Sequence, residues 1–429
     1  MLFIIISLIC GLMIIISDGQ KRFNWCICAM LLISQNIILI QKPQLPVHRF
    51  FLLCFWLSVI FRKEYKGKKF PLIVPLVIYF IGFYLIGYNA EALEPFSKFW
   101  KPTSAIIESY LVLLLAYYGT EKVTVNSKPI INTLYLVMFY GIFTLITKWN
   151  PYQDMIHISP DEAWLNDYYF SDRIRITSTW SHPIAYGFIC SLFFYAFLPY
   201  YKKKKIKILL SLLAFNILIC GSRTDLAAFI LMGAIYIPMR FKASKAIVVG
   251  SVTLIVVSIT YLAVPFIQDK IDTLIGTVDG KDQTGGSSTE MREDQLAASL
   301  YIFNKSPIFG EGPDYVQEQI MPDQDFYSKE GLNFYGFESY GYIIFIERGI
   351  IGIVIELIMF LSIISYALNQ RRKYKEECST ILSISFGFVF FSLSTGVLGT
   401  FTMAMMFIGI TMSRINNTTC IKKRLLEKS

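Results

Sequence analysis

The sequence predicts an all-α integral membrane protein with about 12 to 13 transmembrane helices and a large, partly helical outer loop. Hydrophobic residues make up 54% of the 429 residues and aromatic residues 16%, which is too apolar for a soluble globular chain. Apolar runs approaching the roughly 20 residues that a spanning helix needs recur along the chain, separated by short charged segments.

The apolar runs give roughly thirteen candidate spans. They are residues 1–17, 25–40, 50–61, 70–88, 102–118, 130–148, 183–201, 206–221, 225–239, 245–266, 339–368, 379–395 and 400–415. The third run, "FFLLCFWLSVIF", is short and is the weakest candidate. No basic segment precedes the apolar stretch that starts at Leu2, so a cleavable signal peptide is not expected.

The spans divide the chain into four parts. We expect N-terminal transmembrane helices over 1–148, central helices with an arginine-bearing hairpin over 149–266, a periplasmic loop over 267–338, and C-terminal helices with a basic cytoplasmic tail over 339–429.

Orientation follows from the lysines and arginines, which are retained on the cytoplasmic side of a membrane. In this count the basic loops share one side: "RKEYKGKK" (62–69), "KKKK" (202–205), "RFKASK" (240–245), "RRKYK" (371–375) and the tail "KKR" (422–424). The opposite loops are acidic, above all residues 267–337. The formal net charge of +9 is therefore an orientation signal and does not indicate nucleic-acid binding. The side that holds the basic loops is therefore expected to be cytoplasmic.

The sequence contains little that indicates a metal site or a nucleotide-binding site. The chain has three histidines, His48, His157 and His182, so a histidine-rich metal site is nearly excluded. The cysteines lie in or near apolar spans or on the basic side, which argues against a disulfide framework. The segment "GTVDGKD" is one residue short of a phosphate-binding loop and lacks the Ser or Thr after the lysine. No metal or other cofactor is predicted.

The outer segment before the eleventh span contains one expected helix. In "SSTEMREDQLAASLYIFNKSP", Ser287 and Glu290 fit a capping box, and Leu296, Leu300 and Phe303 recur at helical spacing. These residues predict an amphipathic helix with Arg292 in its first turn, ended by the Pro- and Gly-rich "SPIFGEGPDYV".

The stretch "GSRTD" interrupts an apolar run between two candidate spans. Each of those spans gives about 24 Å of helix at about 1.5 Å per residue, less than the usual core of about 30 Å, so the joint is expected below the outer surface. An arginine at that depth faces a partner or a pathway rather than lipid. We therefore expect Arg223 to form the floor of an outward-facing pocket. The alternative is that it pairs only with Asp225 or with backbone carbonyls at a tight helical hairpin.

Further arginines on the predicted outer side favour an outward-facing pocket at Arg223. Arg173 and Arg175 precede a span, and Arg292 opens the outer helix. Guanidinium groups bind phosphate through planar, bidentate contacts, and a carboxylate such as Glu338 beside them can act as a general base. The alternatives are interfacial anchoring for Arg173 and Arg175, and for His182 a satisfied loop position.

Four stretches in this order resemble the bacterial O-antigen polymerase and O-antigen ligase superfamily. They are "TSTWSHPIAYGFICSLFF", "ILICGSRTDLAAFIL", "MREDQLAASLYIFNKSPIFGEGPDYV" and "ESYGYIIFIERGIIG", and the resemblance covers about residues 170 to 360. It implies that Arg223 and Arg292 hold the diphosphate of a polyprenyl-linked glycan, with Arg175 as a further candidate. One departure is that Glu338 stands where the ligases typically have a histidine.

The resemblance also implies a location in the bacterial inner membrane, with the active site facing the periplasm. The chemistry that it implies is inverting glycosyl transfer without a metal. Arg223 and Arg292 stabilise the diphosphate leaving group, and Glu338 accepts the proton of the attacking hydroxyl. Arg173, His182 and Tyr340 are secondary candidates, and the tyrosine-rich segment from Tyr315 to Tyr340 suits sugar binding or an interfacial belt.

The expected substrates and partners are polyprenyl-diphosphate-linked oligosaccharides, membrane lipid, a chain-length regulator and a flippase. Polymerase and ligase differ in their acceptor, either another lipid-linked repeat or lipid A core, and Glu338 favours the polymerase. Two other classes stay open: a lipid-linked oligosaccharide flippase, and a structural or sensory membrane protein. The clustering of polar groups on one side argues against a transport path.

Overall fold

A computed structural model gives the structure of the chain. It describes residues 2–41, 44–91, 93–120, 123–156, 175–180, 182–242, 244, 288–320, 337, 339–396 and 399–426. The predicted span 245–266, Arg173 and Glu338 lie outside the described residues.

The fold is all-α, as predicted. The first half contains α1 (Leu2–Ile16), α2 (Gly19–Leu32), α3 (Val47–Phe61), α4 (Ile73–Asn89), α5 (Pro95–Glu108), α6 (Leu111–Gly119), α7 (Lys128–Thr147) and α8 (Pro151–Ile156). The second half contains α10 (Pro183–Phe197), the 3-10 turn η2 (Leu198–Tyr200), α11 (Lys204–Ile219), α12 (Arg223–Arg240), α15 (Ser288–Phe303), the π-helical turn η3 (Val316–Ile320), α17 (Tyr340–Gln370), α18 (Lys375–Ser394) and α19 (Gly399–Leu426). A two-stranded antiparallel sheet pairs β1 (Ile38–Ile40) with β2 (Leu45–Pro46).

Several helices have the length and composition to cross a membrane. Among the described residues, four helices are long and apolar enough to cross a membrane: Lys128–Thr147, Pro183–Tyr200, Tyr340–Gln370 and Lys375–Ser394. Three shorter apolar helices accompany them: Leu2–Ile16, Val47–Phe61 and Ile73–Asn89. The chain is thus an all-α membrane protein, and the total of about 12 to 13 spans stays a prediction.

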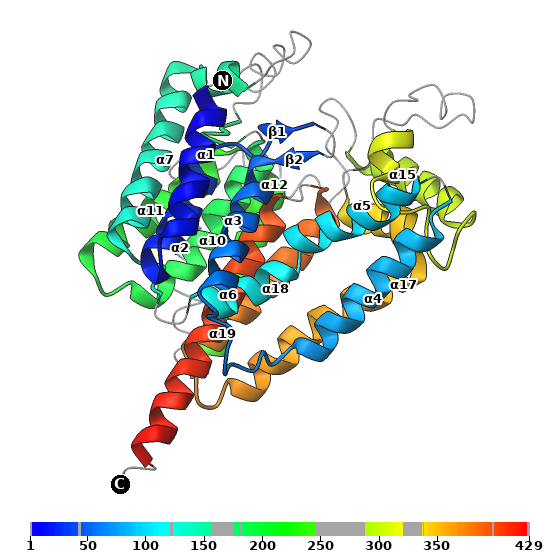
Figure 1. Ribbon diagram of the computed structural model, residues 1–429. Helices are drawn as coiled ribbons and strands as arrows, with labels where there is room; N and C mark the ends of the chain where they lie inside the picture. Colours follow the sequence, from blue (N-terminus) through cyan, green and yellow to red (C-terminus); the bar gives the residue numbers. More distant parts are fainter. Residues whose placement is uncertain are drawn as a thin grey trace.

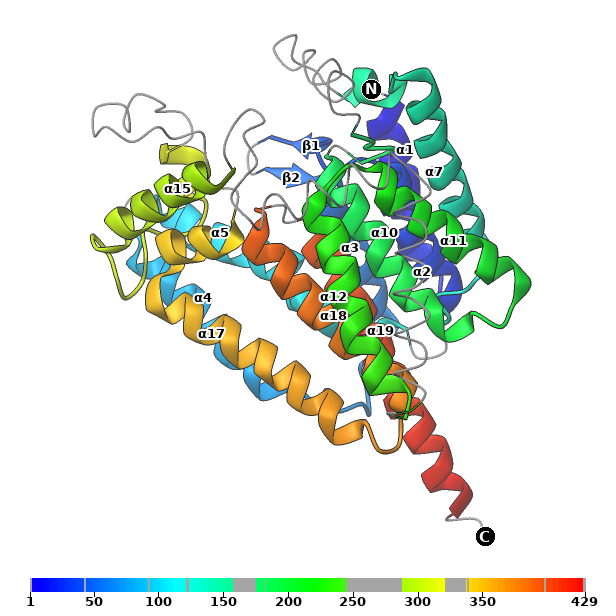
Figure 2. The ribbon, with the colours of Figure 1, turned by 180° about the vertical axis from the view of Figure 1, so that it is seen from behind.

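The helices run between two ends of the molecule (Figure 1). The joints between α3 and α4, α10 and α11, and α17 and α18 lie at one end, which we call the basic end because these joints hold segments 62–69, 202–205 and 371–375. The sheet, α15 and the first residues of α12 and α17 lie at the other, which we call the loop end. Figure 2 shows the same division from behind. These basic joints therefore share one end, as the count of spans requires, and which end faces the cytoplasm stays a prediction.

Two predicted spans differ from the observed helices. The span 25–40 is wrong beyond Leu32, because the chain leaves the helix and residues Ile38–Ile40 pair with β2. The span 102–118 is broken between α5 and α6, since Ser109 has φ −103° and ψ −123°, outside the helical region. By contrast, the weakest candidate, 50–61, is helical within α3.

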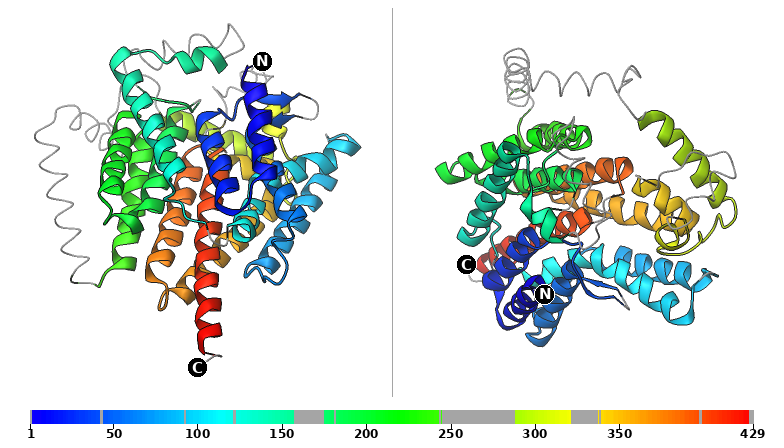
Figure 3. Two further views of the ribbon diagram at one scale, coloured as in Figure 1. Left: turned by 60° about the vertical axis from the view of Figure 1, so that its left-hand side comes forward. Right: turned by 90° about the horizontal axis from the view of Figure 1, so that it is seen from above.

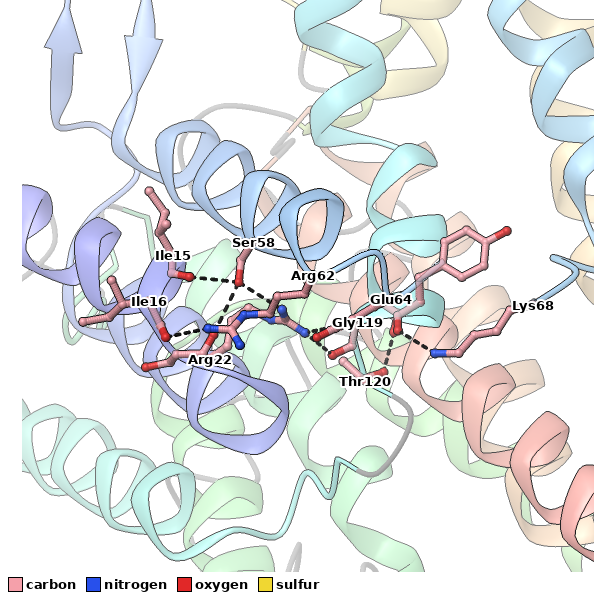
Figure 4. Close-up of polar contacts among 12 residues, drawn as sticks. Ile15, Ile16, Arg22, Ser58, Arg62, Glu64, Lys68, Gly119 and Thr120 are labelled. Atoms are coloured by element: carbon pink, nitrogen blue, oxygen red, sulfur yellow. Dashed lines mark hydrogen bonds and ion pairs between the residues drawn. The ribbon is translucent and has the colours of Figure 1, made fainter. Parts of the chain in front are cut away.

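A buried arginine joins the helices near the basic end (Figure 4). The Arg22 side chain is fully buried and donates to Ser58 Oγ (3.0 Å), to the Gly119 carbonyl (2.9 Å) and to Glu64 Oε2 (2.5 Å). Its guanidinium also stands 4.8 Å from the ring centre of Phe55. One side chain of α2 thereby fastens α3, the segment after it, and α6. A buried charge is tolerated here because it is paired and hydrogen-bonded.

Candidate functional site

The "GSRTD" segment forms the tight joint between α11 and α12. Gly221 has φ +72°, a left-handed conformation that glycine adopts without steric cost. Ser222 then caps α12, its Oγ accepting a hydrogen bond from the Asp225 N–H (3.3 Å). Arg223 is therefore the first residue of the helix, with a partly exposed side chain. The N-terminus of a helix favours anions, so this position suits a phosphate-binding arginine.

Asp225 packs inward beneath this joint. Its side chain is fully buried, and Oδ2 lies 3.6 Å from Sγ of Cys220. The neighbouring helix α10 approaches so closely that a Cβ on Gly187 would lie 2.3 Å from Asp225 Oδ2. Asp225 thus helps to fix how the start of α12 sits against α10, and with it the position of Arg223.

Arg292 lies on α15 at the loop end, with an exposed side chain. The sequence predicted Arg292 in the first turn of this helix. The helix begins at Ser288, so Arg292 lies just after the first turn. The Tyr342 hydroxyl of α17 donates to the Arg292 carbonyl (3.5 Å), which ties this part of α15 to the start of α17.

The helix α15 packs on α17 through a small apolar cluster. Ala298 and Ile302 are buried against Ile346 of α17, whereas Leu296 and Leu300 are 41% and 44% exposed. Of the three residues whose spacing predicted the helix, Phe303 contacts Phe345 of α17, with ring centres 5.8 Å apart. Apolar spacing identified the helix, but both sides of it carry apolar residues, and the smaller Ala298 permits the closer approach to α17.

The turn after α15 docks on a kink in α17 through backbone hydrogen bonds. Glu311 N–H donates to the Ile346 carbonyl (2.8 Å) and Gly312 N–H to the Glu347 carbonyl (3.0 Å). In the other direction, Ile350 N–H donates to Pro307 (2.9 Å) and Ile351 N–H to Ile308 (3.1 Å).

Glycines at the centre of this joint make the close contact possible. Gly349 of α17 has φ +56° and ψ −155°, outside the helical region, and Gly310 has φ +70°. A Cβ on Gly310 would lie 2.3 Å from the Arg348 nitrogen, closer than a real side chain can approach. The "PIFGEG" and "IERGI" stretches, far apart in the sequence, therefore form one structural unit.

Beside the kink lies a buried charge network that the sequence reasoning missed. Arg348 Nη1 contacts Glu356 Oε1 at 2.7 Å, and that carboxylate also accepts from the hydroxyls of Tyr79 (3.2 Å) and Tyr340 (3.4 Å). The Arg348 guanidinium lies 4.5 Å from the ring centre of Phe83 and 5.1 Å from that of Tyr340. Through these contacts the pair connects the kink of α17 to Tyr79 and Phe83 of α4 and to Tyr340 in the first turn of α17. The signal was in the sequence, since "FIERGIIGIVIE" places charges inside an apolar run as "GSRTD" does.

The secondary candidates have structural contacts. Tyr340 is buried, its N–H donates to the Thr395 carbonyl (3.2 Å) and its hydroxyl joins the Glu356 network. His182 caps α10, since its Nδ1 accepts from the Ile184 N–H (3.2 Å). Burial, with a smaller contribution from Arg175, lowers the pKa of His182 to about 4.

The structure brings the elements that carry Arg223 and Arg292 to one end of the molecule, together with the start of α17. The first residue of α12, the helix α15 and the start of α17 all lie at the loop end, on different elements (Figures 1 and 3). A cavity of about 120 Å³ lined by Tyr200, Glu376, Thr411 and Arg414 lies instead toward the basic end, away from these residues. The expected outward-facing pocket at Arg223 stays a prediction.

Within the described parts of the chain, no three or more His, Cys, Asp or Glu side chains form a group that could hold a metal ion.

Comparison with protein families identifies part of the chain. Residues 208–357 match the O-antigen ligase family, and no curated protein matches the chain. The matched range includes Arg223, Arg292, Glu338 and the kink at Gly349, whereas Arg175 lies outside it. The resemblance to the O-antigen polymerase and ligase superfamily is therefore confirmed over this segment. The match supports a membrane enzyme that processes glycans and fits polymerase and ligase equally.

Proposed function

Because residues 208–357 match the O-antigen ligase family, we propose that the chain is a polymerase that joins polyprenyl-diphosphate-linked oligosaccharide repeats at the periplasmic face of the inner membrane. Its product is an O-antigen or a capsular or exopolysaccharide. The observation that carries the proposal is the placement of the matched arginines: Arg223 begins α12 and Arg292 lies on α15, both at the loop end.

The donor needs charge stabilisation more than an acid, because a sugar linked to a lipid diphosphate already carries a good leaving group. Arg223 and Arg292 supply it through guanidinium contacts to the diphosphate, and the helix N-terminus at Arg223 adds favourable partial charge. Arg175 is a further candidate for this role, and Arg173 a secondary one.

The transfer is a single displacement. The acceptor hydroxyl oxygen forms a bond to the anomeric carbon while the bond from that carbon to the diphosphate oxygen breaks. The proton of the hydroxyl passes to Glu338, and the electron pair of the broken bond leaves with the lipid diphosphate. Attack from the face opposite the leaving group inverts the anomeric configuration, and one general base suffices.

The rigid joint between the turn after α15 and the kink of α17 supports this assignment. It couples the helix that carries Arg292 to the helix whose start follows Glu338 in the chain, so the groups that act on leaving group and nucleophile rest on connected elements. Such fixed positioning is what catalysis by orientation requires.

The test is the glycan profile of a strain that lacks the protein. A polymerase predicts a surface that bears single repeats on lipid A core, or no capsular polymer, and its restoration by the wild-type gene. Accumulation of finished lipid-linked polymer would instead identify a ligase. Loss of polymer with lipid-linked repeats trapped on the cytoplasmic side would identify a flippase.

A further inference from the structure

A cavity of about 120 Å³ lies between packed helices toward the basic end, away from the residues of the proposed glycan transfer. Its walls come from α10, η2, α18 and α19, and the three α-helices contact one another around it. The cavity adjoins the charged joints 202–205 and 371–375, so it lies near the level at which the helices leave the membrane (Figure 1). A cavity of this size has room for about four water molecules at roughly 30 Å³ each, and it is smaller than the pockets of about 300 to 1,000 Å³ that enclose larger ligands.

Charged side chains of both signs line this cavity. Arg414 of α19 is one of them, and its guanidinium donates to the Tyr200 hydroxyl and lies 5.2 Å from the centre of the Tyr200 ring. Glu376 and Glu377, in the first turn of α18, supply two carboxylates. A guanidinium binds phosphate oxygens and a carboxylate binds an ammonium group, so the lining matches a small ligand that carries both charges.

The two carboxylates of the lining differ in their contacts. Glu376 Oε2 lies 3.2 Å from Nη2 of Arg240, the last residue of α12, so an arginine already compensates its charge. Glu377 is half-buried, and it makes no hydrogen bond or ion pair with the residues that the structure describes. Removing part of a carboxylate from water costs free energy unless a cation or a donor takes the place of the water. Glu377 is therefore the group of the lining that gains most from a cationic ligand.

We propose that this cavity binds the phosphoethanolamine headgroup of a membrane phospholipid. The phosphate contacts Arg414 and the Tyr200 hydroxyl, and the ammonium contacts Glu377. The membrane supplies such a lipid at the level where the cavity lies, and pockets between spanning helices recognise lipid headgroups in this way. A headgroup without an amine is a poorer occupant because Glu376 and Glu377 repel an anion, and the volume excludes an oligosaccharide. The site is independent of the proposed glycan transfer.

The test titrates delipidated, full-length protein in detergent with short-chain phospholipids and measures bound lipid by native mass spectrometry. The probes are phosphatidylethanolamine, phosphatidylglycerol and phosphatidylcholine, with soluble phosphoethanolamine as a competitor. We expect the wild type to bind phosphatidylethanolamine about ten-fold more tightly than the other two lipids. The reason is that glycerol lacks the ammonium group and the methylated nitrogen of choline cannot donate a hydrogen bond. Glu377→Gln should remove this preference, whereas Arg414→Gln should weaken the binding of all three lipids.

Arg372→Gln is the matched control, since it removes an exposed charge from the joint before α18, outside the lining of the cavity. It should leave the binding of all three lipids unchanged. The comparison of headgroups in the wild type tests the site without any substitution, and equal affinities for the three lipids would overturn it. A Glu377→Gln protein that keeps the preference would also overturn it, because a carboxylate that only stabilises the start of α18 alters the unfolding temperature and not the choice of lipid. Displacement of the lipid by an equal concentration of soluble phosphoethanolamine would assign the cavity to the free small molecule instead of the lipid.

Discussion

Arg348 and Glu356 form an ion pair at 2.7 Å within one helix, although eight residues separate them. Eight residues of straight helix span about 12 Å, so the long arginine side chain must extend along the axis to reach its partner. It starts from the residue just before the kink at Gly349 and ends among the hydroxyls of Tyr79 and Tyr340. The pair therefore spans the kink on which the turn after α15 docks.

Removing one partner of this pair should destabilise the protein. Arg348→Met leaves the Glu356 carboxylate buried without its cation, a change that costs about 3 to 5 kcal/mol in comparable buried pairs. Thermal unfolding in detergent, followed by intrinsic fluorescence, measures the loss. The double variant Arg348→Met with Glu356→Leu should recover part of the stability, because no buried charge is left unpaired. A double variant no more stable than Arg348→Met would show that the charges do not stabilise each other.

The contact between Gly310 and the Arg348 backbone predicts a second effect. Gly310→Ala combines an unfavourable φ of +70° with a Cβ only 2.3 Å from a backbone nitrogen. Gly67→Ala is the matched control, since Gly67 has φ +73° and a Cβ there meets no atom within 4 Å. The control should lose about 1 to 2 kcal/mol of stability, and Gly310→Ala clearly more. Equal shifts in unfolding temperature would mean that the turn yields without cost.

His182 predicts a dependence of stability on pH. Its pKa is lowered to about 4 in the folded protein by burial, whereas in the unfolded chain it is near 6.5. Between these values the unfolded state binds the proton and the folded state does not. The free energy of unfolding is therefore highest above about pH 6.5 and decreases as the pH falls toward 4. Protonation also removes the Nδ1 acceptor that caps α10. His182→Asn keeps a capping acceptor, and its unfolding temperature should fall less between pH 7 and pH 5; parallel curves for both proteins would exclude this role.

Sequence reasoning succeeded where one chemical signal decides the outcome. Long apolar runs predicted most helices, the polar stretch "GSRTD" predicted the joint at Arg223, and lysines and arginines predicted the basic end. It failed where packing decides. The strand Ile38–Ile40 forms because a partner strand lies beside it, and α15 buries Ala298 and Ile302 against Ile346 of α17, a face that the spacing of its leucines does not reveal. The Arg348 network depends on tyrosines of α4 and α17 that no local pattern connects.

The two arginines of the matched segment should both be required for transfer and not for folding. Arg223→Lys and Arg292→Lys keep the charge but lose the planar, bidentate contact to phosphate, so turnover should fall severely while expression and unfolding temperature persist. The assay is elongation of purified lipid-linked repeats in nanodiscs, with binding of undecaprenyl diphosphate measured separately. Lys305→Arg, on the turn that follows α15, is a control that should leave both unchanged. Lysine variants with nearly wild-type rates would remove these residues from the diphosphate site.

Glu338 is the residue on which the proposed proton transfer depends. Glu338→Gln keeps the shape and most hydrogen bonding of the side chain but removes the proton acceptor. Loss of a general base typically lowers the rate on the order of a hundred- to ten-thousand-fold, while substrate binding should be retained. Glu338→His should restore part of the rate, because an imidazole can accept the same proton. The competing explanation is a carboxylate that only stabilises the start of α17 through the helix dipole, worth about 0.3 to 1 kcal/mol, and it predicts a Gln variant with almost normal turnover. Single-turnover elongation of lipid-linked repeats separates the two, because a missing base slows the chemical step itself, whereas a lost dipole contact alters only the unfolding temperature.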